Sequence, residues 1–187
     1  MRLLELDPIQ AEANRVRAAA GIEPDQVIPD IVTVLRGLGL MVAIRELARD
    51  GLDGIYASPE GGGVIVLNGA KFPHRLRCTG AHLLAHHVYG DEPHVDYDIE
   101  MSAGNFVQRR ANAFASRFLV SREAVWTRRG CAGGVTVAEA LDLARDFEVT
   151  YRVILRRLRE VGMTVPTQTA GGSSHLPKST HPSHSAR

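Results

Sequence analysis

The segment Arg77-Cys78-Thr79-Gly80-Ala81-His82-Leu83-Leu84-Ala85-His86-His87 decides the fold class of this 187-residue chain. Its small and apolar residues, followed by Gly90 as a stop signal, predict a helix from about His74 to Tyr89. His82 and His86 lie four residues apart. At about 3.6 residues per turn they differ by only about 40° around the helix axis, so both imidazoles can bind one metal ion.

The residue after His82 is Leu83. In the H-E-x-x-H pattern of helical zinc proteases this position carries a glutamate, which takes a proton from the zinc-bound water and delivers it to the leaving amine. A leucine side chain can do neither. The segment therefore keeps the two histidines of a zinc site and lacks the general base.

Two other segments flank this helix in a telling order: Gly63-Val64-Ile65-Val66-Leu67-Asn68 before it and Ala111-Asn112-Ala113-Phe114-Ala115-Ser116-Arg117-Phe118-Leu119 after it. Together the three segments resemble the ImmA/IrrE family of zinc metallo-endopeptidases. The family pattern runs from a strand ending in asparagine, through R-F-T-L-A-H-E-L-G-H, to E-x-x-A-N-x-F-A-x-x-L-L-M-P. The resemblance covers about Val27 to Met163, with a degenerate H-E-x-x-H motif.

The resemblance implies an α+β fold in which a small sheet packs on a zincin-like helical core. It also implies a zinc ion held by two histidines of one helix and a carboxylate of the next long helix, with a water in the fourth position. Counting back from Ala111-Asn112, the third-ligand position is Gln108, or Arg110 under a shifted alignment. Neither side chain is a carboxylate, and the neutral amide of Gln108 is only a weak ligand.

Two alternatives stay open for the histidines. His82 and His86 either bind zinc weakly, or hydrogen-bond inside a former cleft without metal. Asp96, Asp98 and Glu100 follow the helix in an acidic stretch that we expect to be irregular. One of them is an alternative third ligand, and a solvated acidic loop is the simpler interpretation.

Periodicity and capping signals predict the remaining elements. We expect three strands that form a small antiparallel sheet, at 40–44, 54–57 and 63–67, and further helices at 8–20, 30–37, 102–120, 121–129, 136–147 and 150–162.

The last two predicted helices form a pair like a helix-turn-helix within residues 136–163. Arg152 and Arg156 lie on the basic side of its second helix, which makes DNA contact an alternative function. We place one metallopeptidase-type domain at 1–163. The Ser-, Pro- and His-containing residues 164–187 have the composition of a disordered tail.

The composition does not indicate a class of partner, because the 22 Lys and Arg residues nearly balance the 21 Asp and Glu residues in charge. No stretch predicts a signal peptide or a membrane span, and Cys78 and Cys131 are interpreted as free thiols, so we expect a cytoplasmic protein.

These observations leave three hypotheses. The leading one is a catalytically impaired protein of the ImmA/IrrE type that binds a regulatory partner through the former substrate cleft. The resemblance implies that this partner is a helix-turn-helix repressor. The second is an active zinc endopeptidase that cleaves such a repressor and recruits a carboxylate from the acidic stretch. The third is a DNA-binding regulator that acts through Arg152 and Arg156.

Overall fold

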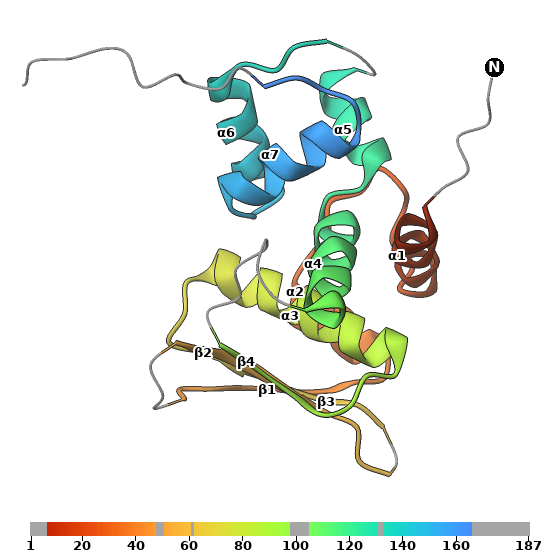
Figure 1. The fold of residues 1–187 in the computed structure, drawn as a ribbon, viewed down its shortest axis with the longest axis vertical. Helices are drawn as coiled ribbons and strands as arrows, with labels where there is room; N and C mark the ends of the chain where they lie inside the picture. The colour runs from red at the N-terminus through yellow and green to blue at the C-terminus, as the bar shows by residue number, and fades with distance from the viewer. Residues whose placement is uncertain (1–6, 48–50, 61, 98–104, 131–132, 166–187) are drawn as a thin grey trace, which may run out of the picture.

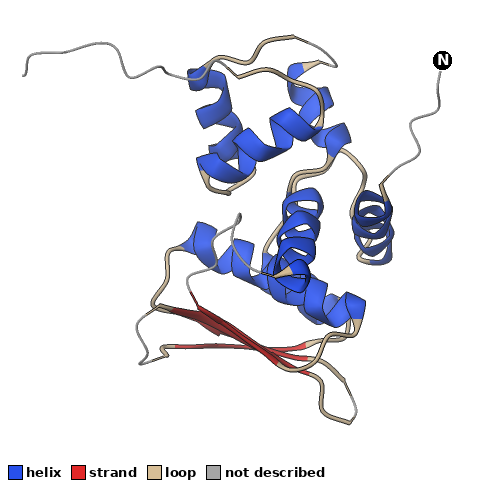
Figure 2. Cartoon of the chain, in the orientation of Figure 1, coloured by secondary structure: helices blue, strands red, loops and turns tan. Residues whose placement is uncertain are grey.

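A computed structural model describes residues 7–47, 51–60, 62–97, 105–130 and 133–165. A small sheet forms one layer, and the helices lie on one side of it (Figure 1). Helix α3 (Pro73–Tyr89) runs across the sheet, and the C-terminal helices gather at the opposite end of the molecule from the sheet (Figure 2). The predicted α+β class is confirmed.

Most helices lie close to their predicted bounds. The structure contains α1 (Pro8–Ala19), α2 (Ile31–Gly37), α4 (Phe106–Leu119), α5 (Arg122–Arg129), α6 (Val137–Asp146) and α7 (Tyr151–Glu160) in addition to α3. Side chains cap the first turn of each of these helices except α3. Thr136 and Glu139 form a capping box at the start of α6, and the Thr150 side chain accepts a hydrogen bond from the Val153 amide. The predicted start of α4 at Ser102 lies outside the described residues.

The sheet has four strands in the order β1-β3-β2-β4. Their bounds are β1 (Met41–Arg45), β2 (Leu52–Ala57), β3 (Val64–Asn68) and β4 (His94–Tyr97). The pair β2 and β3 is antiparallel, as predicted, but β1 runs parallel to β3, so the sheet is mixed. The two strands can be parallel because β2, which lies between them in sequence, runs in the opposite direction. It returns the chain to the end of the sheet where β1 begins.

Strand β4 differs from the prediction of an irregular acidic stretch at 91–101. It pairs with β2 in antiparallel register, with a shift between Leu52 and Gly54. His94 and Asp96 alternate with exposed Val95 and Tyr97. This alternation of two polar and two apolar residues is too short to predict a strand without knowledge of its partner.

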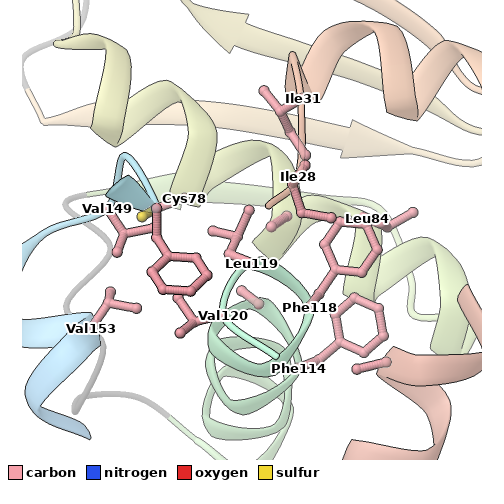
Figure 3. Packing of buried hydrophobic residues seen from close by; sticks show 14 of the residues in the cluster. Ile28, Ile31, Cys78, Leu84, Phe114, Phe118, Leu119, Val120, Val149 and Val153 are labelled. Atoms are coloured by element: carbon pink, nitrogen blue, oxygen red, sulfur yellow. The ribbon is translucent and has the colours of Figure 1, made fainter. Parts of the chain in front are cut away.

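Helix α3 packs closely on the sheet because β2 carries a glycine beneath it. A Cβ on Gly54 would lie 2.8 Å from Leu83 Cδ1 and 3.0 Å from Thr79 Cγ2, so a larger residue would push the helix away. On its other side α3 packs against α4, where Phe114, Phe118 and Leu84 meet (Figure 3). The helix is therefore held between sheet and helices, and its histidines occupy fixed positions.

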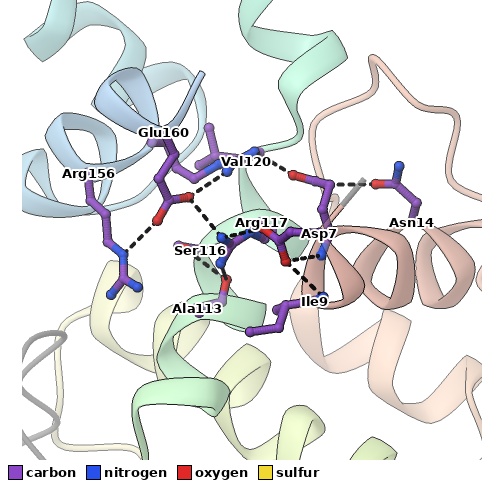
Figure 4. Close-up of polar contacts among 11 residues, drawn as sticks. Asp7, Ile9, Asn14, Ala113, Ser116, Arg117, Val120, Arg156 and Glu160 are labelled. Atoms are coloured by element: carbon purple, nitrogen blue, oxygen red, sulfur yellow. Dashed lines mark hydrogen bonds and ion pairs between the residues drawn. The ribbon is translucent and has the colours of Figure 1, made fainter. Parts of the chain in front are cut away.

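Buried arginines join the outer helices to this core. Arg17 of α1 donates to the carbonyl oxygen of Phe118, and Arg157 of α7 donates to the carbonyl oxygen of Val120, both at 2.8 Å. Arg157 is 2 % exposed and also pairs with Glu160 at 2.7 Å. Figure 4 shows Glu160 and Asp7 on either side of Arg117, at the meeting point of α1, α4 and α7.

Two sequence expectations concern the termini and membranes. The tail predicted at 164–187 lies almost wholly outside the described residues, which end at 165. Within the part of the chain that the structure describes, no helix is long and apolar enough to cross a membrane.

Candidate metal centre

Three buried side chains converge between α3 and β4: His82, His86 and Asp96. The two Nε2 atoms of the histidines are 3.1 Å apart, and Asp96 Oδ2 lies 3.4 Å from His82 Nε2 and 3.9 Å from His86 Nε2. Zinc bonds of about 2.0–2.2 Å in a tetrahedral site place neighbouring ligand atoms about 3.3–3.6 Å apart. The three atoms thus stand near the spacing that one ion requires.

The Nδ1 atom of each histidine makes a hydrogen bond that orients its ring. His82 Nδ1 donates to Asn112 Oδ1 at 2.8 Å, and His86 Nδ1 donates to Asp91 Oδ2 at 2.9 Å. A ring that donates through Nδ1 keeps a lone pair on Nε2 when it is neutral. Metal-binding histidines in proteins are commonly oriented in this way, by an oxygen that accepts a hydrogen bond from the ring nitrogen away from the metal.

The site fits a divalent cation better than it fits no ion. Asp96 Oδ2 is buried and has no hydrogen-bond partner among the described residues, and it faces the Nε2 lone pairs of His82 and His86. Three acceptors that share one buried space repel each other unless a proton or a metal cation lies between them. Two imidazoles and one carboxylate form a donor set that suits zinc.

Ionisation also favours binding. Burial, with the neighbouring His82, lowers the pKa of His86 and so favours the neutral ring that binds metal. Burial acts to raise the pKa of Asp96, but the His82 ring and the Gln108 amide lower it by more, so the carboxylate form is favoured.

Gln108, the third-ligand position predicted from the sequence, lies beside Asp96. Its Nε2 donates to Asp96 Oδ1 at 2.9 Å and also contacts His94 Nε2. The acid that the structure brings to the histidines is Asp96, which the sequence offered as an alternative. Asp98 and Glu100, the other two alternatives, lie outside the described residues.

Arg110, the ligand position under the shifted alignment, is engaged elsewhere. Its Nη2 lies 2.5 Å from Asp91 Oδ1, and its guanidinium lies over the Tyr89 ring, 4.1 Å from the centroid. Arg110 therefore fixes the carboxylate that orients His86. Sequence reasoning missed the orienting roles of Asp91 and Asn112, because neither residue has a fixed spacing from the histidine that it contacts.

Leu83 belongs to the hydrophobic core. It is 0 % exposed, and its side chain points at Gly54 of the sheet. The position at which a zinc protease carries its general base is therefore filled by an isobutyl group between α3 and β2. Two acids with described contacts lie at the site, Asp96 against the histidine Nε2 atoms and Asp91 bound to His86 and Arg110.

The basic side of α7 is only partly available at the surface. Arg157 points into the molecule, and Arg156 Nε donates to Glu160 Oε1 at 2.9 Å. Arg152 is exposed. Arg157 of the same helix therefore has a structural role.

Comparison with known proteins gives a family and a fold. The family model of the IrrE N-terminal-like domain, a metallopeptidase family, matches residues 35–159. Among solved structures, a protein described as a Mycobacterium tuberculosis transcriptional regulator superposes with a TM-score of 0.54 at 17% identity, covering 82% of this chain and 47% of that one. The chain thus spans less than half the length of that neighbour. No curated protein sequence matches it.

Proposed function

Because this chain belongs to the family of IrrE N-terminal-like domains, we propose that it is a regulatory protein that binds a protein partner on a metallopeptidase fold without cutting it. The observation that carries this proposal is Leu83, which is fully buried against the sheet at the general-base position. Loss of acid–base catalysis alone removes about 10²–10⁴ in rate.

Among the residues that the structure describes, no acid near the site is free to replace the missing base. Asp96 directs one oxygen at the histidines and the other at Gln108, and Asp91 is paired with both His86 and Arg110. A general base must reach the reacting water with a free lone pair. Both carboxylates are instead committed to holding other side chains.

The proposal includes a resident zinc ion held by His82, His86 and Asp96. Bound zinc supplies a Lewis acid and lowers the pKa of a bound water. Around it, this chain's own residues orient the imidazoles through Asn112 and Asp91, and Leu83 and Gly54 close the helix onto the sheet. In the absence of a base the site serves to fix structure.

The partner that we propose is a helix-turn-helix transcription factor. The similarity to a transcriptional regulator supports a regulatory context, although at 17% identity it is a likeness of fold alone. A surface cavity of about 780 Å³ offers a place for a peptide segment, and its lining includes apolar Leu141, Val149 and Tyr151 with charged Arg145 and Glu148. None of the three metal-site residues lines this cavity.

The test combines capture with a cleavage assay. A candidate transcription factor is co-purified with the chain, and the intact mass of the factor is followed after zinc is added. We expect a stable complex and an uncut factor, with capture weakened by Leu141→Asp in the cavity and unchanged by Glu12→Gln on α1, which lies outside the cavity lining. Cleavage that is abolished by His82→Ala would show an active peptidase instead.

That active peptidase is the second candidate, and one observation favours it. Asp96 lies beside the two histidines and offers the carboxylate that the sequence pattern lacked, which supports a set of three protein ligands for zinc. The third candidate, DNA binding through Arg152 and Arg156, predicts salt-dependent binding to duplex DNA that weakens in Arg152→Ala and Arg156→Ala. The absence of a mobility shift at low salt would exclude it.

A further inference from the structure

We infer that zinc joins strand β4 to helix α3 in this chain, with Asp96 as the carboxylate ligand and Gln108 as the positioning residue that aims it. This inference rests on the zinc-binding part of the proposed function and is independent of the partner. It concerns three elements, because His82 and His86 come from α3, Asp96 from β4, and Gln108 from the first turn of α4.

The two oxygens of Asp96 have different surroundings. Oδ1 accepts a hydrogen bond from Gln108 Nε2 at 2.9 Å, whereas Oδ2 has no hydrogen-bond partner in the described part of the chain and faces the histidines. Asp96 is 3 % exposed, so water does not compensate Oδ2. Because one oxygen is held, the other is directed at the space between the two Nε2 atoms.

Gln108 is suited to this positioning role because it is neutral and donates. Its helix is fixed at this end by Asn105, whose side chain accepts a hydrogen bond from the Gln108 backbone amide at 3.1 Å. A glutamate here would place a second carboxylate against Asp96 Oδ1 in place of the donor, and two like charges at that distance repel. The amide therefore supports a carboxylate ligand that comes from the neighbouring strand.

Strand β4 is the element that gains most from such a tie. It has four residues, stands at the end of the strand order, and its ladder to β2 is interrupted by the register shift between Leu52 and Gly54. Short edge strands with few ladder hydrogen bonds open easily. A bond from Asp96 to an ion on α3 would hold the strand from its inner face.

The consequence is that metal occupancy sets the order of the sheet edge beside the site. With the ion bound, β4 is fixed between β2 and α3. Without it, the three atoms at 3.1–3.9 Å repel each other unless an imidazole Nε2 takes up a proton, and β4 can also relieve the repulsion by moving away. A partner that contacts this edge would then distinguish the two states of the chain.

The test measures zinc affinity and strand opening in the full chain. Zinc affinity is measured by competition with a chromophoric chelator for the parent, Asp96→Asn, Gln108→Ala and the control Asp142→Asn, an exposed acid on α6. We expect about a 10–100-fold loss for Gln108→Ala, as is typical when a residue that orients a metal ligand is removed, a larger loss for Asp96→Asn, and no change for the control. Equal circular dichroism of the metal-free variants shows that all are folded.

Hydrogen exchange tests directly whether zinc holds β4. A purely structural role of Asp96 would not make the exchange of the β4 amides depend on zinc. In the parent, zinc should slow amide exchange in peptides containing 94–97, and this protection should be lost in Asp96→Asn while zinc still slows exchange near His82. An Asp96→Asn affinity equal to that of the parent, or zinc protection confined to α3, would overturn the inference. A parent that binds zinc normally but captures no transcription factor would contradict the partner proposal and leave this inference standing.

Discussion

Replacement of Leu83 should show whether the side chain at the general-base position now stabilises the hydrophobic core. The side chain is 0 % exposed, and its Cδ1 atom faces Gly54, which has no side chain to fill a void. Leucine-to-alanine changes in cores cost about 2–5 kcal/mol, and the cost is greatest where the site cannot collapse. We therefore expect Leu83→Ala to lower the free energy of unfolding by about 3–4 kcal/mol.

Leu83→Glu should be at least as damaging in the metal-free chain. It removes the same apolar contact and brings a carboxylic acid into a space between helix and sheet, where an ionised group is strongly disfavoured. Zinc should recover part of this loss, because a glutamate that turns toward a bound ion leaves the apolar space. Leu83→Gln is the control for Leu83→Glu, because glutamine has nearly the shape of glutamate and carries no charge. It separates the loss of packing from the burial of a charge.

The measurement is urea unfolding followed by circular dichroism, with zinc and with a chelator. Leu84→Ala is a matched control, because Leu84 is 1 % exposed on the same helix but packs toward α4 (Figure 3). We expect similar losses for the two alanine variants and a zinc-dependent recovery only for Leu83→Glu. A cost below about 1 kcal/mol for Leu83→Ala would refute the assignment of this position to the core.

Three further outcomes follow from contacts outside this position. Burial opposes ionisation of Glu160, but its arginine neighbours lower the pKa of this carboxyl below the ordinary 4.5. Ionised Glu160 therefore stabilises the folded chain above about pH 4.5, and this contribution is lost as the pH falls through the folded-state pKa. Thermal or urea unfolding of Glu160→Gln, which weakens the pairing of buried Arg157, should show a loss of about 1–3 kcal/mol at pH 7 that shrinks toward pH 4. Asp91→Asn should reduce zinc affinity about 10–100-fold by releasing His86, measured by chelator competition. Burial raises the pKa of the Cys78 thiol to about 11, so in the folded chain at pH 8 it should react with a thiol reagent far more slowly than in urea.

Local patterns in the sequence accounted for most of the helical fold. Helix periodicity and capping residues placed α1, α2, α3 and the α6–α7 pair within a few residues of their observed bounds. These signals work because a helix is stabilised by contacts three and four residues apart, all within one short segment. The same locality fixed the pairing of His82 with His86 and the absence of a glutamate between them.

The sheet was less accessible from sequence. The parallel pairing of β1 with β3 and the existence of β4 depend on which strands meet, and strand pairing joins residues that are far apart in the chain. The four residues of β4 carry no strong pattern of their own. They become a strand because β2 offers them a free edge.

Sequence alone thus determined the two candidate imidazole ligands and the absence of a glutamate between them, since both are properties of one helix. Tertiary structure alone decided that Asp96 faces the histidines while Gln108 supports it, and that Asn112 and Asp91 orient the rings. The physical reason is that a helix repeats its geometry every few residues, whereas a site shared by α3, α4 and β4 exists only where packing brings those elements together.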